Sequence, residues 1–300
     1  MGWNELLTGY AKTQRAGNLS EKTIQNRHEC ISMLATRSRK TLQDITLDDL
    51  EALLARTHHR TGKPLAQGTM QSERSYLQSF FAWAKERGHR KGNPAKKLRK
   101  VKMTRRKPRP LNASQIDAML DTGAYSRTRD IITIAALTGL RLGEVVKLRG
   151  EDIDLDGMTI RAVRKGDLHW RGPLPAGLLP TLTRYPRQGW MFPSPYPNKE
   201  FPDGDGHILM ASASDAVSKA IRRAGITDPN ITGHSLRHYL ATTMLREGAN
   251  LRVVQETLGH ASLATTQLYS GVTDEELADG INLVPVIELR PRSGRGKIAA

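Results

Sequence analysis

The feature that most constrains the fold is a basic segment about one third of the way along the chain. Between Lys96 and Arg109, nine of the fourteen residues are Lys or Arg, none is Asp or Glu, and Pro108 and Pro110 close the segment. Like charges at this density repel one another and stay in water, so the segment is unsuited to a packed core. We therefore expect a basic interdomain linker at residues 96–110, between two domains, a number that 300 residues can accommodate. A plain disordered tether is the alternative interpretation.

Residues 1–95 are expected to form a helical domain. Apolar residues recur at helical spacing after two N-cap candidates, Ser20 and Thr46, and again between Thr69 and Arg87. Gly88 follows as a C-cap, because glycine adopts the left-handed conformation that commonly ends a helix.

Residues 111–283 are expected to form a second, mainly helical domain that includes a small β-sheet. Residues 157–174 have β character and predict a hairpin with Lys165 near its turn. The Pro-, Gly- and Asp-rich residues 186–206 predict a loop. A C-terminal tail, residues 284–300, begins with an apolar, strand-like piece. Helices are expected from a cap at Asn112 or Ser114 through Leu120, and at about residues 129–138, 142–148, 212–224, 234–247, 251–258, 263–269 and 274–282.

The composition points to a polyanionic partner. The chain has 46 Lys and Arg residues against 30 Asp and Glu, which gives a formal net charge of +16. Neutralising the phosphates of a nucleic acid releases condensed counterions, so this excess favours nucleic acid over other partners. Aromatic residues make up only 5% of the chain, which argues against a base-stacking, single-strand-binding platform. A soluble protein that is merely basic is the alternative.

The remaining composition indicates a cytoplasmic setting. Cys30 is the only cysteine, so no intramolecular disulfide can form, which fits a reducing compartment. The sequence has no apolar run approaching the ~20 residues of a transmembrane helix and no apolar signal core at its N-terminus. We therefore expect no membrane partner.

Six residues of the second domain have the chemistry needed to hold and attack a phosphodiester. An arginine can bind two phosphate oxygens through its planar fork, and a phenol with a pKa near ~10 becomes a nucleophile beside cations or a base. Arg141 follows a break at Gly139, where a helix start also offers N–H groups to an anion, and Glu144 can pair with it. His234 and Arg237 are three residues apart, on one helix face. The set is Arg141, Lys165, His234, Arg237, His260 and Tyr269. Taken singly, each is more often an ordinary surface, core or ion-pair residue, so the hypothesis depends on the joint pattern.

A metal site is the main competing interpretation of the histidines. His234 and His238 are four residues apart, as in a zinc-binding helix. In zinc hydrolases a Glu follows the first His, whereas Ser235 stands at that position here, and no cysteine or acidic cluster completes a ligand set. We therefore expect neither a metal nor another cofactor.

Three motifs along the second domain resemble those of one family. They are residues 138–144 (Thr-Gly-Leu-Arg-Leu-Gly-Glu), residues 234–238 (His-Ser-Leu-Arg-His), and residues 258–269, in which Leu-Gly-His-Ala-Ser is followed by Thr-Thr and Tyr269. Their order and spacing closely resemble the tyrosine recombinases, also called phage integrases. The first domain, with Asn-Pro-Ala at residues 93–95, resembles the helical core-binding domain of that family. One departure is the hairpin after Lys165, where Leu, His and Trp replace residues that are usually polar and often basic.

The resemblance implies a fold and a mechanism. The fold would be a two-domain, C-shaped DNA clamp that is mainly α, with a small β-sheet in the catalytic domain. Tyr269 would attack the scissile phosphate to form a 3′-phosphotyrosine link, with no metal or ATP. Arg141 and Arg237 would clamp the nonbridging oxygens. Lys165 would protonate the leaving 5′-oxygen, His234 would assist proton transfer at the nucleophile, and His260 would hydrogen-bond the phosphate.

The resemblance also implies partners. The chain would act on double-stranded DNA as a homotetramer, through a Holliday junction, with accessory DNA-bending or directionality factors possible. The C-terminal tail would dock on a neighbouring subunit or fold back on its own domain. Two helices of the first domain would enter the major groove while the linker crosses the DNA backbone, with ordinary polar helix faces as the alternative. The expected DNA-contacting residues are Thr23, Arg27, Thr69, Gln71, Arg74, Lys100, Lys102, Arg105 and Arg106.

The preferred interpretation is therefore a site-specific recombinase, acting as a compact phage or prophage integrase. A Xer-type chromosome or plasmid resolvase has the same size and chemistry and is the first alternative. A type IB topoisomerase and a DNA-binding regulator without catalysis are the other two.

Overall fold

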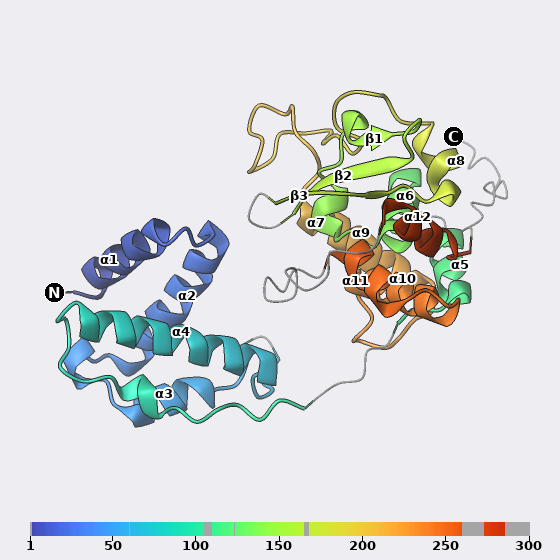
Figure 1. Cartoon of the computed structure of the whole chain (residues 1–300). Helices are drawn as coiled ribbons and strands as arrows, with labels where there is room; N and C mark the ends of the chain where they lie inside the picture. Colours follow the sequence, from blue (N-terminus) through green and yellow to red (C-terminus); the bar gives the residue numbers. More distant parts are fainter. Residues whose placement is uncertain are drawn as a thin grey trace, which may run out of the picture. The chain divides into compact units, whose positions relative to one another are not determined.

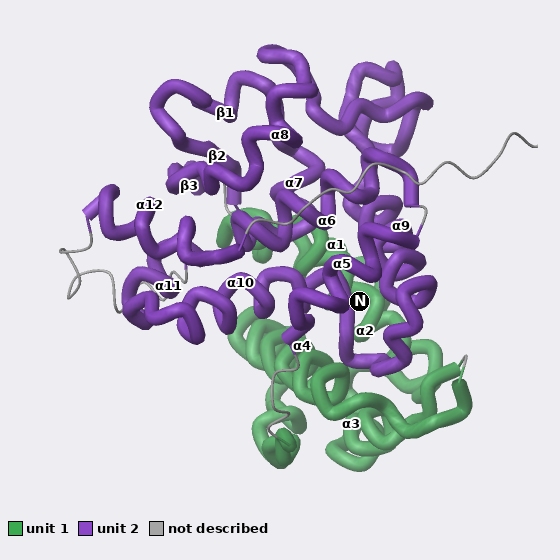
Figure 2. Tube along the Cα trace, turned by 90° about the vertical axis from the view of Figure 1, so that its right-hand side faces the viewer, with its two compact units in different colours: residues 1–106 green, residues 107–300 purple. Residues whose placement is uncertain are grey.

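The chain divides into two compact units, residues 1–106 and residues 107–300 (Figure 1; Figure 2). The computed structural model describes residues 2–59, 61–104, 110–122, 124–164, 168–259 and 273–285. Within these ranges, no helix is both long enough and apolar enough to cross a membrane. Each unit has a hydrophobic core of its own.

Unit 1 is helical, and the two predicted N-caps are confirmed. The side chain of Ser20 accepts a hydrogen bond from the Thr23 N–H, and Thr46 and Asp49 form a reciprocal capping box. The helices of this unit are α1 (Trp3–Ala16), α2 (Glu21–Ser38), α3 (Leu47–Leu54) and α4 (Gln67–Glu86), with short 3₁₀ turns at Leu42–Asp44 and Pro94–Lys97.

An aromatic cluster lies at the centre of the unit 1 core. The ring of the fully buried Phe80 meets that of Tyr10 edge-on, with 5.3 Å between their centroids, and Trp83 packs beside both. Such edge-on contacts add to the free energy gained by burying the rings. Cys30 is buried in the same core.

The first residues of the basic segment pack on unit 1, although the sequence placed a linker from residue 96. Ala95 and Leu98 are buried in the unit 1 core, and the Arg74 guanidinium donates two hydrogen bonds, of 3.2 and 2.9 Å, to the Leu98 carbonyl oxygen. The N–H of Thr104 donates to the side chain of Gln67 at 3.0 Å. Ala95 and Leu98, which flank the first two lysines of the segment, therefore keep this part of it with the domain that precedes it.

Unit 2 combines helices with a three-stranded antiparallel sheet in the order β1-β2-β3, which confirms the predicted fold class. In the register of β2 and β3, Ala162 faces Trp170 and Arg164 faces Leu168. The strands are β1 (Ile153–Asp154), β2 (Thr159–Arg164) and β3 (Leu168–Pro173). The helices are α5 (Ala113–Asp121), α6 (Ser126–Thr138), α7 (Leu142–Val145), α8 (Leu179–Leu182), α9 (Met210–Arg223), α10 (His234–Arg246), α11 (Leu251–Leu258) and α12 (Asp274–Asn282).

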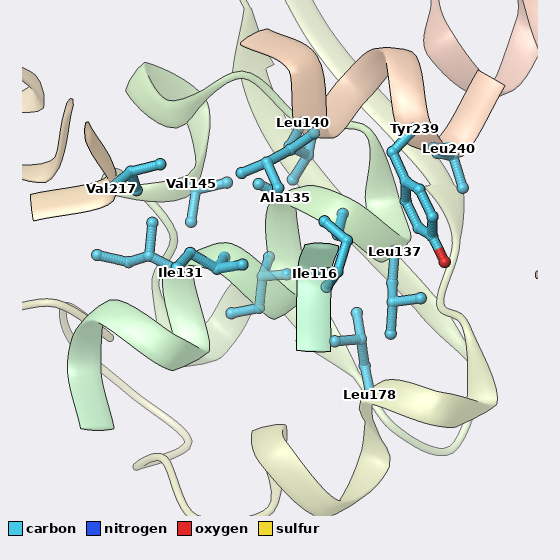
Figure 3. Close-up of a cluster of buried hydrophobic side chains, with 14 of the residues drawn as sticks. Ile116, Ile131, Ala135, Leu137, Leu140, Val145, Leu178, Val217, Tyr239 and Leu240 are labelled. Atoms are coloured by element: carbon cyan, nitrogen blue, oxygen red, sulfur yellow. The ribbon is translucent and has the colours of Figure 1, made fainter. Parts of the chain in front are cut away.

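Helix α6 runs through the core of unit 2. Nearly all of its residues from Thr128 onward are buried, as expected for a helix that is covered on every side. Figure 3 shows side chains of α6, such as Ile131 and Leu137, packed among residues of neighbouring helices, including Val217 of α9 and Tyr239 of α10. This core holds the C-terminal end of α6 and the middle of α10 in fixed positions.

The sequence-based bounds are wrong for α7, which ends at Val145 instead of continuing to Leu148. The chain turns there because residues 148–150 pair with a distant segment. The Leu148 carbonyl oxygen accepts from the Met191 N–H at 3.0 Å, and the Gly150 N–H donates to the Gly189 carbonyl oxygen at 2.9 Å. This partner segment lies within residues 186–206, which contain no helix or strand, as predicted.

Helix α12 packs within its own unit, against α11 and β3. The side chain of Asn282 accepts a hydrogen bond of 3.1 Å from the Ala176 N–H, and Ile281 and Val284 are buried in the unit 2 core. The first residue of the expected tail, Val284, therefore lies on its own domain. The rest of the strand-like piece, from residue 286, lies outside the described residues, as does the helix expected at residues 263–269.

Candidate active site

Arg237 connects the ends of two helices in unit 2. One amino group of its guanidinium, Nη1, donates to the Gly139 carbonyl oxygen at 2.6 Å, and Nη2 donates to the Leu258 carbonyl oxygen. Gly139 is the C-cap residue directly after α6, and Leu258 is the last residue of α11. The C-cap glycines of the two helices, Gly139 and Gly259, both have positive φ. Carbonyl groups at helix C-termini lack intrahelical donors and carry partial negative charge, so both are suited to a cation.

Burial and neighbouring charges make this guanidinium electrostatically unusual. Arg237 is only 4% exposed. Its pKa is lowered to about 10, first by burial and then by the charges of Arg141 and Arg164, while Glu144 acts in the opposite direction. Groups with strongly shifted pKa values cluster at functional sites, because the same crowding of charge that shifts them can bind a ligand.

Arg141 is held by Glu144, as the sequence predicted. Its Nη1 lies 2.9 Å from Glu144 Oε1, and the buried carboxylate also accepts from the Arg141 backbone N–H at 2.9 Å. The Arg141 side chain is 46% exposed, so it is accessible to a ligand. The Arg141 N–H, one of the backbone donors at the start of this helix, is already used by Glu144. Gly139 has φ +66°, which allows the sharp turn from α6 into this segment.

A third arginine, which the sequence analysis did not single out, belongs to the same cluster. Arg164 ends β2, and its guanidinium carbon lies 4.1 Å from the centroid of the Trp170 ring. Its pKa is lowered to about 10, mainly by burial, with Glu144 raising and Arg141 lowering it. A Cβ atom at Gly259 would lie 1.3 Å from Arg164 Nη1, so the guanidinium rests directly against that glycine. In the sequence, the only indication that Arg164 belongs to the site is its position next to Lys165.

His234 occupies the first turn of α10 and is exposed. Its ring meets that of His238 edge-on, with centroids 5.2 Å apart. Arg237, one turn along, is buried in the helix–helix contact just described. In the described ranges of the chain, no group of three or more His, Cys, Asp or Glu residues is placed to hold a metal ion.

Three of the six predicted catalytic residues lie outside the described residues: Lys165, His260 and Tyr269. The residues that immediately precede two of them are described and are in contact. Arg164 comes before Lys165, Gly259 comes before His260, and the Arg164 guanidinium rests on Gly259. The fold therefore brings the hairpin, the end of α11 and the Arg237 guanidinium to one place.

In unit 1, two of the predicted DNA-contacting arginines bond within the unit. Arg27 donates to the side chains of Tyr10, Gln14 and Ser79 at 3.1–3.3 Å, and Arg74 bonds the Leu98 carbonyl. Thr69, Lys100 and Lys102 are exposed, Thr23 and Gln71 are half-buried, and Arg105 and Arg106 lie outside the described residues.

Together, these contacts make a cationic site in unit 2. Arg141, Arg164 and Arg237 carry three positive charges, and among the described residues Glu144 is the one carboxylate that acts on both buried guanidiniums. An excess of charge in a partly buried place is unfavourable unless an anion binds there. Guanidiniums bind phosphate oxygens with strong, directional hydrogen bonds, so a phosphate group fits this site.

Comparisons with known proteins agree with this chemistry. Residues 109–276, more than half of the chain, match the phage integrase family. The tyrosine recombinase XerC of Alcanivorax borkumensis is 30% identical over 286 residues, which cover 92% of this chain and 90% of XerC. Among solved structures, the integrase of mycobacterium phage Brujita is 28% identical, with 96% of this chain and 95% of that one covered and a TM-score of 0.54.

A lambda integrase tetramer bound to a Holliday junction has the same fold, with a TM-score of 0.67 at 20% identity, over 90% of this chain and 80% of that one. The similarities therefore extend over both units and not over the catalytic motifs alone. The chain belongs to the phage integrase family and is a tyrosine recombinase, an enzyme of site-specific DNA recombination.

Proposed function

We propose that this recombinase cuts and rejoins duplex DNA through a covalent link between Tyr269 and the 3′ side of the break. The Tyr269 oxygen forms a bond to the scissile phosphorus, and the bond from phosphorus to the 5′-oxygen breaks. The phenol proton leaves with help from His234, and Lys165 gives a proton to the departing 5′-oxygen. Because one phosphodiester replaces another, the reaction consumes neither ATP nor a metal-bound nucleophile.

The proposal is supported most directly by the meeting point of Arg237, Arg141 and the Arg164–Gly259 contact. In the proposed mechanism, Arg141 and Arg237 hold the nonbridging oxygens, where negative charge grows in the transition state. Glu144 keeps Arg141 in place for this task. His260 donates a hydrogen bond to the same phosphate.

We further propose that unit 1 and the basic segment bind the DNA around the cleavage point. Thr69 at the start of α4 and Thr23 in the first turn of α2 are suited to contacts in the major groove. Lys100, Lys102, Arg105 and Arg106 would neutralise backbone phosphates, which adds affinity without sequence preference. Arg27 and Arg74 would act mainly by stabilising unit 1, since both bond to groups within it.

The assembly proposed is a homotetramer on two paired core sites, passing through a Holliday junction. The lambda integrase tetramer with a similar fold supports this arrangement. The two units would close around DNA as a clamp, and the protein would work in the cytoplasm, with accessory DNA-bending or directionality factors setting the direction of exchange.

The role proposed first is integration and excision of phage or prophage DNA, supported by the similarity to the Brujita integrase over nearly the whole chain. A Xer-type resolvase is the second candidate, because the XerC match also covers at least 90% of both chains. Plasmids with two copies of the core site separate these roles. A resolvase acts mainly between sites on one molecule, whereas an integrase also joins sites on two molecules.

The chemistry is tested by trapping the covalent link. The protein is incubated in EDTA with a library of nicked duplexes of randomised core sequence, in which the short fragment beside the break diffuses away. Adducts are precipitated with SDS and potassium, and their DNA is sequenced to recover the core site. The proposal predicts adducts on a defined sequence with the wild type and none with Tyr269→Phe.

Two other results would overturn the proposal. Adducts that persist in Tyr269→Phe would assign the nucleophile to another residue, and DNA bound without any adduct would indicate a regulator. Relaxation of a supercoiled plasmid that lacks the selected site would instead indicate a topoisomerase.

A further inference from the structure

Arg164 is positioned as a ligand-binding group and not as a structural ion pair. It lies on the same face of β2 as the buried Ile160 and Ala162, because side chains alternate along a strand. Trp170 stands on the adjacent strand, diagonal to Arg164, and its ring forms a platform for the guanidinium at 4.1 Å. Stacking on an aromatic face fixes the plane of a guanidinium while leaving its N–H edges available.

Those N–H edges have no acceptor in the described part of the chain. Arg164 Nε is fully buried and makes no hydrogen bond there. Arg237 already uses two donors on carbonyl groups, and Arg141 uses one on Glu144. Arg164 is therefore the member of the cluster with its donors uncommitted, and a buried, unsatisfied donor implies a missing acceptor.

The neighbouring backbone makes room for this side chain. Gly259 has φ +56°, and any Cβ there would collide with Arg164 Nη1. The end of α11, which also supplies the Leu258 carbonyl to Arg237, thus brings two guanidiniums to the same short stretch of backbone. One anion placed there would be within the field of both guanidiniums, which are close enough that the charge of Arg164 lowers the pKa of Arg237.

We propose that Arg164 is a third phosphate-binding arginine, which contacts a nonbridging oxygen of the scissile phosphodiester and stabilises its charge in the transition state. This inference rests on the proposed function, because it names a further catalytic residue of the same site. Trp170 is a positioning residue that holds Arg164 in place.

The test compares Arg164→Gln with the wild type on the core-site duplex recovered from the adduct library. Three quantities are measured: the dissociation constant, the rate of adduct formation at saturating protein, and the melting temperature of the protein. Arg161→Gln is the matched control, because Arg161 lies on the same strand, carries the same charge and is exposed, with its guanidinium on the Glu151 carbonyl. Trp170→Leu and Trp170→Phe test the platform.

Removing one preorganised donor from a developing charge slows catalysis by about 100-fold, and that loss of rate is expected for Arg164→Gln. The dissociation constant should change by less than about threefold, because DNA binding is dominated by many other phosphate contacts. The melting temperature should not fall. Trp170→Leu should slow adduct formation when it is made in the wild-type protein, but it should cause no further loss when it is added to Arg164→Gln. Trp170→Phe should retain activity.

Each contrary result has a distinct meaning. If Arg164→Gln forms adducts at the wild-type rate at saturating protein, whether or not its affinity for DNA is lower, the proposal is overturned while the adduct chemistry stands. A fall in melting temperature together with the rate would assign Arg164 a structural role, which also overturns it. If the wild type itself gives no adduct, the failure belongs to the proposed function.

Discussion

The Arg237 guanidinium and the Gly139 carbonyl oxygen, 98 residues apart in sequence, are joined by a hydrogen bond of 2.6 Å. The same guanidinium bonds the Leu258 carbonyl, so one side chain connects the C-terminal ends of α6 and α11. In the proposed mechanism the remaining donors of Arg237 hold a phosphate oxygen, so this residue would have a structural and a chemical task.

Arg237→Gln should lower both stability and catalysis. Two buried carbonyl groups lose their charged donor, and each loss lowers the free energy of unfolding by about 1–3 kcal/mol. Part of this loss is offset, because the repulsion of Arg237 with Arg141 and Arg164 is relieved. We expect the free energy of unfolding to fall by about 1–3 kcal/mol and adduct formation by at least about 100-fold. Urea titration and the trapping assay measure the two effects. Arg246→Gln, at the exposed end of the same helix, is the control and should change neither.

Arg164→Gln should behave differently, with a dependence on pH. The pKa of Arg164 is lowered to about 10 in the folded protein, so the folded state holds this proton less tightly than the unfolded state does. Below about pH 10 the charge on Arg164 therefore lowers the free energy of unfolding, and this destabilisation decreases as the pH rises above that value. Unit 2 of Arg164→Gln should be at least as stable as the wild type at pH 7, and the difference should narrow at higher pH. A clear loss of stability at pH 7 would contradict this account.

Glu144→Gln should slow catalysis without weakening DNA binding. The amide keeps one hydrogen-bond acceptor but loses the charge that orients Arg141. Misplacing one phosphate ligand is expected to slow cleavage by about 10-fold at saturating protein, while removing a negative charge leaves DNA affinity equal or higher. Filter binding and single-turnover cleavage give the two values. Glu151→Gln is the control, since Glu151 pairs with Arg149 at an exposed position.

Gly139→Ala should destabilise unit 2 through backbone strain and through overpacking. Gly225→Ala is the control that shows the effect of backbone strain alone. Gly139 has φ +66°, and a Cβ there would lie 2.6 Å from Leu258 Cδ2 and 2.8 Å from Leu240 Cδ2. Gly225 has φ +73° with nothing within 4 Å, so Gly225→Ala measures the backbone strain alone. We expect about 1 kcal/mol for Gly225→Ala and about 2–4 kcal/mol for Gly139→Ala, from strain plus overpacking. Equal losses in thermal unfolding would show that the α6–α11 contact is not tightly packed.

Elements with local start and stop signals could be predicted from the sequence closely. The bounds of α11 and α12 are as predicted, because Asn250 and Thr273 cap their first turns and Gly259 ends α11 in the left-handed conformation. The pairing of Arg141 with Glu144 was likewise predictable, since residues three apart lie on one side of a helical turn.

Features set by distant partners could not be predicted in this way. The early end of α7 depends on residues 189–191, and the inward orientation of Arg27 depends on Tyr10 and Ser79 of other helices. Arg164 escaped notice because its importance comes from Trp170 across the sheet and Gly259 at the end of a remote helix. No short-range pattern reports such contacts.

The central claim, that Tyr269 is the nucleophile, is tested most directly by locating the DNA on the protein. The trapped adduct is digested with nuclease and trypsin, and the peptide that retains a nucleotide is identified by mass spectrometry. Trypsin should release residues 253–292 as one peptide, in which Tyr269 is the only tyrosine. The account predicts the nucleotide on Tyr269 of this peptide, through a link that is stable to alkali. A nucleotide on any other residue would contradict it.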